Sequence, residues 1–432
     1  MKSMKTMIRL MTCAVVATMS MEAARASLNI PSDGSDGALV IAEDTVIDLS
    51  QAVTSNWDAN NGANVGKGIY DSNKWAVVFK YSSVTIQAGA TVTFKNHASR
   101  APVVWLVQGD VAINGTVSLD GQSSQPPPWL AEPGPGGFRG GAGDYAAGAA
   151  NAAGFGPGGG GLYGVEMGGG AAYGSAVAGN HGWYGAATYG NPSLIPLVGG
   201  SGGGGVTSNR NYGWVSTSGG AGAGAMLIAA AGNLSILGAI RANGGGITIN
   251  SDMAGGGSGG GIRLVAENLS GSGILQATGG SGSQNPGGLG RIRLERTTNS
   301  FAGTLVPTGP SVVELAPGAT PVIWLPSNGP TVRIVSIEGK SASADPRAGF
   351  GAIGADIVLP QVANVTVVVE TTVAEDASTV TVRATPRSNG NYSERVASLT
   401  EVVSEDPKVI RWTANVPVSD GYAAIQVKVV RP

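Results

Sequence analysis

The chain has 432 residues, of which 26 are basic and 28 acidic, for a formal charge of −2, and it contains one cysteine and two histidines. A slightly acidic chain without a basic stripe is a poor binder of nucleic acid. A single cysteine excludes a disulfide framework within the chain and a cysteine-ligated zinc site.

The first 26 residues have the pattern of a secretory signal peptide. Three basic residues precede the 12-residue apolar run 10–21, and Ala24-Arg25-Ala26 follows it. A membrane span needs about 20 apolar residues, and no later run is that long. We therefore expect cleavage before Ser27 and export to the extracellular space, the outer cell surface or the periplasm. The mature chain then keeps 22 basic and 27 acidic residues, a charge of −5, and loses Cys13.

A short acidic motif follows the predicted cleavage site. Asp33 and Asp36 stand in the sequence DGSDG, where two carboxylates lie close together in a glycine-containing loop. Loops of this kind bind Ca²⁺ in some proteins and are ordinary turns before a strand in others. The turn is the interpretation that the short motif favours, and no other cofactor is predicted.

Three similar segments predict a repeating β-structure at 103–121, 226–245 and 262–280. Each has an apolar strand, a glycine corner and a second alternating strand, and the equivalent positions include Ile240 and Leu275 and, in a weaker copy, Leu305. Because one unit is too small to bury its own apolar face, successive units are expected to stack. We predict a right-handed parallel β-helix, or β-solenoid, formed by 27–121 and 225–321. A β-sandwich with long glycine loops is the alternative.

Glycine is concentrated between the first and the later repeats. Residues 134–290 contain 52 of the 71 glycines, without the three-residue period of collagen. We expect an insertion at 122–224 that packs against the solenoid, with glycines at sharp corners and close approaches. Its aromatic residues are candidates either for binding a glycan or partner chain or for covering the glycine backbone: Tyr163, Tyr173, Trp183, Tyr184, Tyr189, Tyr212 and Trp214.

The sequence contains few candidates for catalytic groups. Residues 134–290 contain four acids, of which Asp144 and Glu166 lie in the insertion. They would serve as a glycosidase pair only if the fold brought them within about 5 to 10 Å. His97 and His181 lie in polar turns and are expected at the surface. Arg263 and Arg293 occupy equivalent outward positions of the repeat. At the surface they would form either a small cationic ladder on the solenoid or ordinary solvated side chains.

Beyond about residue 321 the composition changes. Residues 322–432 contain about seven alternating valine- and threonine-rich runs, separated by turn sequences such as Ser388-Asn389-Gly390. This spacing predicts a separate β-sandwich module of immunoglobulin-like or fibronectin-like type.

The block APVVWLVQGDVAINGTVSLDG (101–121), the following PGPGGFRGG (133–141) and the later GGGIRLVA (259–266) resemble glycine-rich secreted bacterial proteins of mostly unassigned function. The resemblance covers roughly residues 30–300. It implies a β-solenoid at the cell exterior and transfers no catalytic residue.

Three functions remain open from the sequence. The first is a non-enzymatic structural or adhesive protein of the cell surface, which binds a glycan or surface protein through the insertion. The second is a carbohydrate-active β-helix enzyme, a polysaccharide lyase or a glycoside hydrolase. The third is a self-associating matrix or fibre protein.

Overall fold

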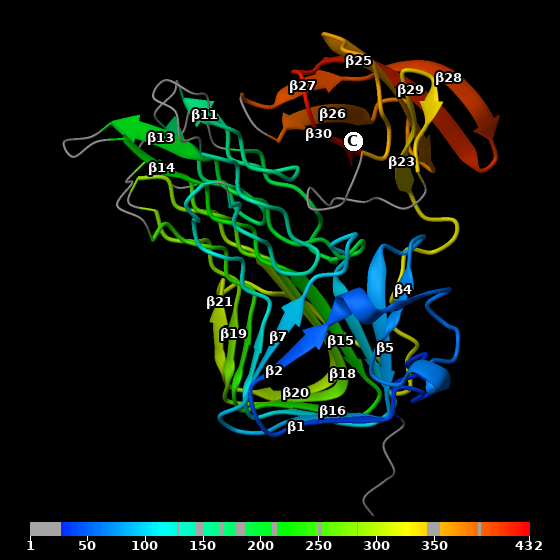
Figure 1. Cartoon of the computed structure of the whole chain (residues 1–432). Helices are drawn as coiled ribbons and strands as arrows, with labels where there is room; N and C mark the ends of the chain where they lie inside the picture. The colour runs from blue at the N-terminus through cyan, green and yellow to red at the C-terminus, as the bar shows by residue number, and fades with distance from the viewer. Residues whose placement is uncertain are drawn as a thin grey trace, which may run out of the picture.

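The computed structural model describes residues 27–127, 129–143, 151–163, 167–177, 186–209, 214–248, 253–282, 284–343, 355–387 and 390–432. The described chain is all-β, and its only helical pieces are two single 3₁₀ turns, η1 (Leu49–Gln51) and η2 (Gly62–Asn64). The described chain has three parts: a region of parallel strands, a glycine-rich bundle and a C-terminal module (Figure 1).

The first row of parallel strands begins at β5 (Ala76–Tyr81). From there each strand pairs in parallel with the next, through β8 (Val103–Val107), β15 (Ala225–Ala230), β18 (Gly261–Gly271), β20 (Arg291–Phe301) and β22 (Ser311–Glu314). At the other end, β4 (Ile69–Asp71) pairs with β5 in the antiparallel sense and β3 (Val53–Thr54) pairs with β4.

Two further rows repeat the same order. One joins β1 (Ala38–Ile41), β6 (Ser83–Ile86), β9 (Val111–Ile113) and β16 (Asn233–Ile236) to the later halves of β18 and β20. The other runs through β2 (Thr45–Asp48), β7 (Thr91–Lys95), β10 (Thr116–Ser118), β17 (Ala239–Arg241), β19 (Ile274–Gln276) and β21 (Thr304–Val306). From β5 onward the chain visits the three rows in turn, and the long strands β18 and β20 each span the first two rows.

The register matches the repeat that the sequence predicts. Ile240 pairs with Leu275, and Leu275 pairs with Leu305. β8 and β15 are adjacent, although about 120 residues separate them in the sequence. A row of large side chains runs through the interior of this region, where Phe79, Trp105, Ile228, Leu264 and Leu294 occupy successive paired positions and are buried. A slip of one residue would move this row to the opposite face of the sheet, where a second apolar cluster that includes Val104 and Leu227 is packed.

The glycine-rich segments form a bundle of extended chains. It contains the segments near 119–125, 132–143, 151–162, 167–175, 198–206, 217–225, 241–248, 253–261, 276–282 and 284–291. The links between later passes of the parallel region therefore belong to it, as well as the predicted insertion. Figure 1 shows these extended segments lying side by side above the parallel strands.

Hydrogen bonds in the bundle recur at every third residue, as the segment 217–225 shows most fully. Amides that lie three residues apart donate to the same neighbouring segment. Ser218, Ala221 and Gly224 donate to the carbonyl oxygens of Gln125, Gln122 and Leu119, and Gly219, Gly222 and Ala225 donate to those of Gly141, Phe138 and Pro135. Gly220 and Ala223 donate to a third segment, at Gly255 and Ser258. Segment 255–260 shows the same rotation among three neighbours. A chain whose amides return to the same direction after three residues has the geometry of a polyproline II helix, which has no internal hydrogen bonds. The peptide groups are satisfied by neighbouring helices instead.

Close approach explains the glycines of the bundle better than sharp corners do. A Cβ on Gly203 would lie 2.0 Å from the carbonyl oxygen of Gly255, and one on Gly257 would lie 1.9 Å from that of Ala221. Among the described glycines of 134–290, only Gly136, Gly156, Gly190 and Gly271 have a positive φ. Of the two roles expected for glycine, packing of backbone against backbone is therefore the common one here.

Two short antiparallel pairs lie in the bundle. They are β11 (Leu162–Tyr163) with β12 (Met167–Gly168), and β13 (Val206–Asn209) with β14 (Trp214–Thr217). A small apolar cluster that includes Val206, Met253 and Met167 packs beside them.

The C-terminal module has two antiparallel sheets around one core. The larger sheet has the order β24 (Lys340–Ser341), β23 (Thr331–Ile337), β25 (Asn364–Thr372), β29 (Lys408–Pro417) and β28 (Ser398–Glu405). The smaller has the order β27 (Ser393–Val396), β26 (Thr379–Pro386) and β30 (Ala423–Val430). Val367, Val382 and Trp412 are buried in the shared core.

One surface expectation is wrong. Arg263 is 1% exposed rather than solvated, because the linker after β22 covers it. Its Nε donates to Glu295 at 2.8 Å, and its other nitrogens donate to the carbonyl oxygens of Val322 and Ile323. Arg293 shares the same Glu295 carboxylate at 2.6 Å. Arg263, held by Glu295, thus connects the linker to the sheet.

Candidate functional site

Tyr173 and Tyr189 lie inside the glycine bundle, so they do not form a binding surface. Their hydroxyls donate to the carbonyl oxygens of Val198 at 2.8 Å and Gly199 at 2.6 Å, and Ser201 donates to the Tyr189 hydroxyl. Burial raises the pKa of the Tyr189 hydroxyl well above its usual value. For these two residues the structure supports the second sequence interpretation, in which aromatic rings fill space within the glycine backbone.

Tyr163 differs, because 54% of its side chain is exposed at the end of β11. Trp183, Tyr184 and Tyr212 lie outside the described residues, as does the side chain of Trp214. Two other described aromatic side chains are at least half exposed: Trp129 at 68%, in the proline-rich loop after Gln125, and Tyr422 at 50%, in the C-terminal module. Neither residue is among the binding candidates that the sequence predicts. The three-proline run before Trp129 was a usable signal, whereas nothing in the sequence near Tyr422 distinguished it.

The C-terminal module is joined to the glycine bundle by polar contacts. Arg383 on β26 is 4% exposed, and it donates to the carbonyl oxygen of Gly156 at 3.0 Å. Its guanidinium also pairs with Glu394 and lies 3.8 Å from the centre of the Tyr392 ring. We call this contact zone the joint.

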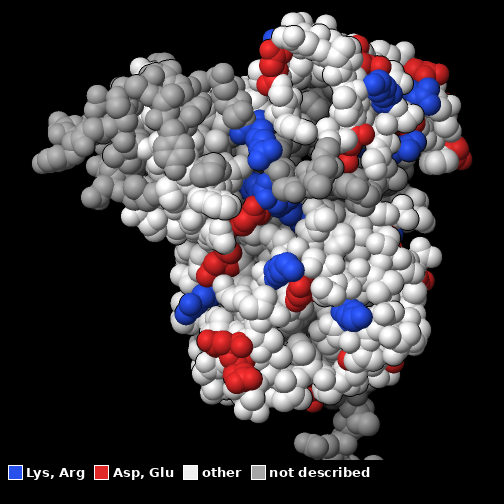
Figure 2. All heavy atoms as spheres, in the orientation of Figure 1, with Lys and Arg blue, Asp and Glu red and all other residues white. Residues whose placement is uncertain are grey.

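Backbone groups complete the joint. The Gly390 amide donates to Asn151 at 2.8 Å, the Ala153 amide donates to Gly390 at 3.1 Å, and Asn391 donates to the Leu162 carbonyl oxygen at 3.5 Å. Figure 2 shows Lys and Arg side chains gathered along the boundary where the module meets the rest of the molecule, while much of the visible surface is uncharged.

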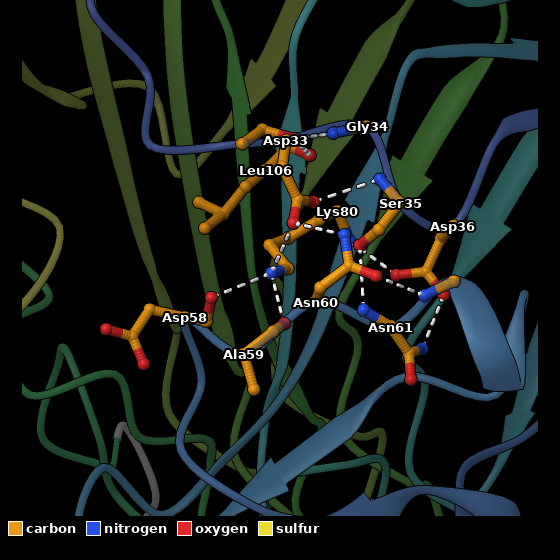
Figure 3. Close-up of polar contacts among 12 residues, drawn as sticks. Asp33, Gly34, Ser35, Asp36, Asp58, Ala59, Asn60, Asn61, Lys80 and Leu106 are labelled. Carbon is orange, nitrogen blue, oxygen red and sulfur yellow. Dashed lines mark hydrogen bonds and ion pairs between the residues drawn. The ribbon is translucent and has the colours of Figure 1, made fainter.

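The acidic loop near the N-terminus is occupied by a lysine (Figure 3). The Lys80 side chain is 2% exposed, and its Nζ donates to Asp33 at 3.2 Å, to the Asp58 carbonyl oxygen at 3.1 Å and to the Ala59 carbonyl oxygen. Asp36 accepts from Asn61 at 2.6 Å and from the Lys80 amide at 2.7 Å. The two carboxylates therefore hold this loop to β5, and Lys80 Nζ lies where a cation bound by Asp33 would lie.

The ionisation of Asp33 follows from these contacts. Partial burial raises its pKa, but hydrogen bonds from Ser35 and the bond and charge of Lys80 outweigh burial and bring the pKa down to about 2. Asp33 is thus a carboxylate at neutral pH. Among the described residues, no three His, Cys, Asp or Glu side chains are grouped as a metal site requires.

Acid–base chemistry has little support in the described residues. Asp144, Glu166 and His181 lie outside them. His97 is half-buried, its Nδ1 is hydrogen-bonded to the Ser99 hydroxyl, and its ring centre lies 4.2 Å from that of Tyr70. An open groove of 340 Å³ runs along one corner of the parallel region, where Gly115, Gly238 and Gly273 stack on successive passes. None of the described residues that line this groove has a titratable side chain.

Comparisons with protein-family models, with curated proteins and with solved structures gave no match. The described part of the chain contains no helix that is long and apolar enough to cross a membrane.

Proposed function

We propose that the protein is an exported, non-enzymatic structural or adhesive protein of the cell exterior, which binds a glycan or a surface protein through the glycine-rich part and its neighbours. The observation that carries the proposal is the bundle itself. Its segments satisfy one another's peptide groups at every third residue, so a region that resembles a flexible linker in composition forms a packed body on which exposed aromatic side chains are held.

The parallel region is proposed to be a right-handed β-helix and the C-terminal module an immunoglobulin-like or fibronectin-like sandwich. The three parallel rows and the aligned repeats support the first, and the two antiparallel sheets around one valine-rich core support the second. In this arrangement the β-helix serves as a rigid base for the glycine bundle.

Export is tested by expressing the full chain in a bacterium and determining the N-terminus of the released protein. The signal-peptide proposal requires that it begin at Ser27. Binding is tested by applying the purified mature protein to a panel of acidic and neutral polysaccharides and to whole cell surfaces. Retention on a polysaccharide or a surface supports the adhesive proposal, and no retention on any of them contradicts it.

The carbohydrate-active enzyme is the second candidate function from the sequence. Incubation of the same polysaccharides with the protein, followed by measurement of new reducing ends and of unsaturated products, separates it from an adhesive protein. Turnover that disappears in Asp144→Asn or Glu166→Gln would replace the adhesive proposal by the enzymatic one.

Self-association would require another copy to pair with the last strand of the parallel region, and the features of that strand do not favour such pairing. β22 has only four residues, Pro310 precedes it, and the charged Glu314 ends it. Short strands, prolines and charges at a sheet edge oppose pairing with another copy. We therefore expect sedimentation velocity to show a monomer, and fibres in electron micrographs would favour the matrix protein instead.

A further inference from the structure

Two of the three aromatic side chains that are at least half exposed in the described structure flank the joint. Tyr163 belongs to the bundle and immediately follows Leu162, whose carbonyl oxygen accepts a hydrogen bond from Asn391. Tyr422 belongs to the module, and its carbonyl oxygen accepts a bond of 2.8 Å from the amide of Arg387, four residues before Asn391. Figure 1 places β11 beside the end of the module from which β27 starts.

The joint has the construction of a fixed surface rather than a loose contact. Arg383 ties β26 to the Gly156 carbonyl oxygen, and the same guanidinium supports the ring of Tyr392, which is partly exposed. The paired backbone bonds of Gly390 with Asn151 and Ala153 set the distance between the two parts. Tyrosines from both parts are thereby held without the ordering cost that flexible loops would add on binding.

The chemistry of this surface fits a carbohydrate. Tyrosine offers a flat apolar ring with a polar hydroxyl, which stacks on the C–H face of a sugar while it bonds to sugar hydroxyls. The exposed Asn391 beside the rings supplies an amide that both donates and accepts. A protein partner would favour an apolar centre, whereas the described contacts of the joint are mainly polar.

We propose that the joint is a composite carbohydrate-binding surface, to which the glycine bundle contributes Tyr163 and the C-terminal module contributes Asn391, Tyr392 and Tyr422. This inference rests on the proposed adhesive function and goes further, because it assigns a binding role to the module and makes binding depend on both parts at once.

The test uses the mature full-length protein and the polysaccharide that it binds most tightly in a panel of acidic and neutral polymers. Affinity is measured by isothermal titration calorimetry for the wild type and for Tyr163→Ala, Tyr422→Ala, Asn391→Ala and Trp129→Ala. The side chains of Tyr163, Tyr422 and Trp129 are exposed, so thermal unfolding of these three variants should stay unchanged. Asn391→Ala also removes the bond to the Leu162 carbonyl oxygen, so its binding is compared with the wild type only after its thermal unfolding has been measured. Trp129→Ala is the matched control, because it removes a more exposed aromatic ring outside the joint.

We expect each tyrosine variant to weaken binding about tenfold, Asn391→Ala to weaken it less, and Trp129→Ala to leave it unchanged. Normal binding by both tyrosine variants, or loss of binding in Trp129→Ala alone, would overturn the composite surface while the adhesive function stands. If the wild type binds no polysaccharide but captures a cell-surface protein, the surface is not a carbohydrate site. If the wild type binds neither, the adhesive function itself fails.

Discussion

The parallel region and the glycine bundle are packed by opposite means. In the parallel region, large side chains such as Trp105 and Phe79 fill the interior, and the backbone hydrogen bonds run only between neighbouring strands. In the bundle most contacts are made by glycines, which have no side chain, and successive peptide groups of one segment bond to three neighbouring segments in turn. The difference shows that a chain can form a packed body from apolar burial or from backbone contact. The second way requires glycine, because a Cβ would collide with a carbonyl group.

The largest loss of stability is expected in the parallel region, where side chains fill the interior. Trp105 is fully buried, so Trp105→Ala leaves a large cavity and should lower the free energy of unfolding by about 3–5 kcal/mol. Urea unfolding followed by circular dichroism measures the loss. Trp129→Ala is the control, and as a surface change it should stay within about 0.5 kcal/mol of the wild type. Equal losses in both variants would mean that the interior row does not hold the parallel region together.

The backbone half of the comparison is tested by adding a single methyl group. In Gly203→Ala the new Cβ would lie 2.0 Å from the Gly255 carbonyl oxygen and 2.3 Å from its carbon, so two segments must separate. Because both contacts are to backbone, we expect a loss of about 3 kcal/mol in the free energy of unfolding, at the upper end of the usual cost of overpacking.

Gly309→Ala provides the control for that experiment. A Cβ at Gly309 meets no atom within 4 Å, and its φ is not in the left-handed region. The substitution should therefore be neutral or stabilise the protein by up to about 1 kcal/mol, since alanine restricts the unfolded chain. If Gly203→Ala proved as harmless as Gly309→Ala, the closely packed bundle would be wrong.

A smaller effect is expected where the two kinds of packing meet. Tyr189 inserts a ring among the glycines, and its hydroxyl both donates to Gly199 and accepts from Ser201. Tyr189→Phe keeps the ring but leaves those groups without their partner, which should cost about 1–2 kcal/mol. Thermal unfolding of this variant, compared with Tyr163→Phe at an exposed ring, isolates the buried hydroxyl. An unchanged stability would show that the ring alone matters.

The sequence predicted more of the parallel region than of the bundle for a physical reason. Alternating apolar residues at equivalent positions indicate strand pairing directly. The three residues that align in the sequence, Ile240, Leu275 and Leu305, are therefore the ones that pair in neighbouring strands. Glycine carries no such signal, because the same residue fits a corner, a linker or a backbone contact. The three-residue rotation of hydrogen bonds also involves neighbours that are distant in sequence, and no local pattern reports them.

Burial of charged and aromatic residues was equally hidden in the sequence. Arg263 stands at an outward position of its strand, as the alternation predicted, but the linker that covers it begins about 50 residues later. Tyr173 and Tyr163 both precede glycine in similar surroundings, yet one ring is enclosed and the other exposed. Only the packing of whole segments decides between these outcomes.

The smallest expected effect concerns pH at the Lys80 contact, which ties the N-terminal segment to β5. The folded pKa of Asp33 is about 2, below its ordinary value of 3.8, so the ionised carboxylate stabilises the folded protein above about pH 4. This contribution is lost as the pH falls from about 4 toward 2. Because the Asp33 side chain is 38% exposed, solvent screening limits the contribution to roughly 1 kcal/mol or less.

Asp33→Asn removes this carboxylate while keeping the shape of the side chain. The variant should be less stable than the wild type at pH 7 by up to about 1 kcal/mol, and the difference should shrink as the pH approaches 2, where the wild-type carboxyl also becomes neutral. Urea unfolding of both proteins at a series of pH values measures it. A difference that stays constant down to pH 2 would show that the lysine is held by the carbonyl oxygens of Asp58 and Ala59, with no contribution from the charge of Asp33. The loop would then be held by backbone groups, as the glycine bundle is.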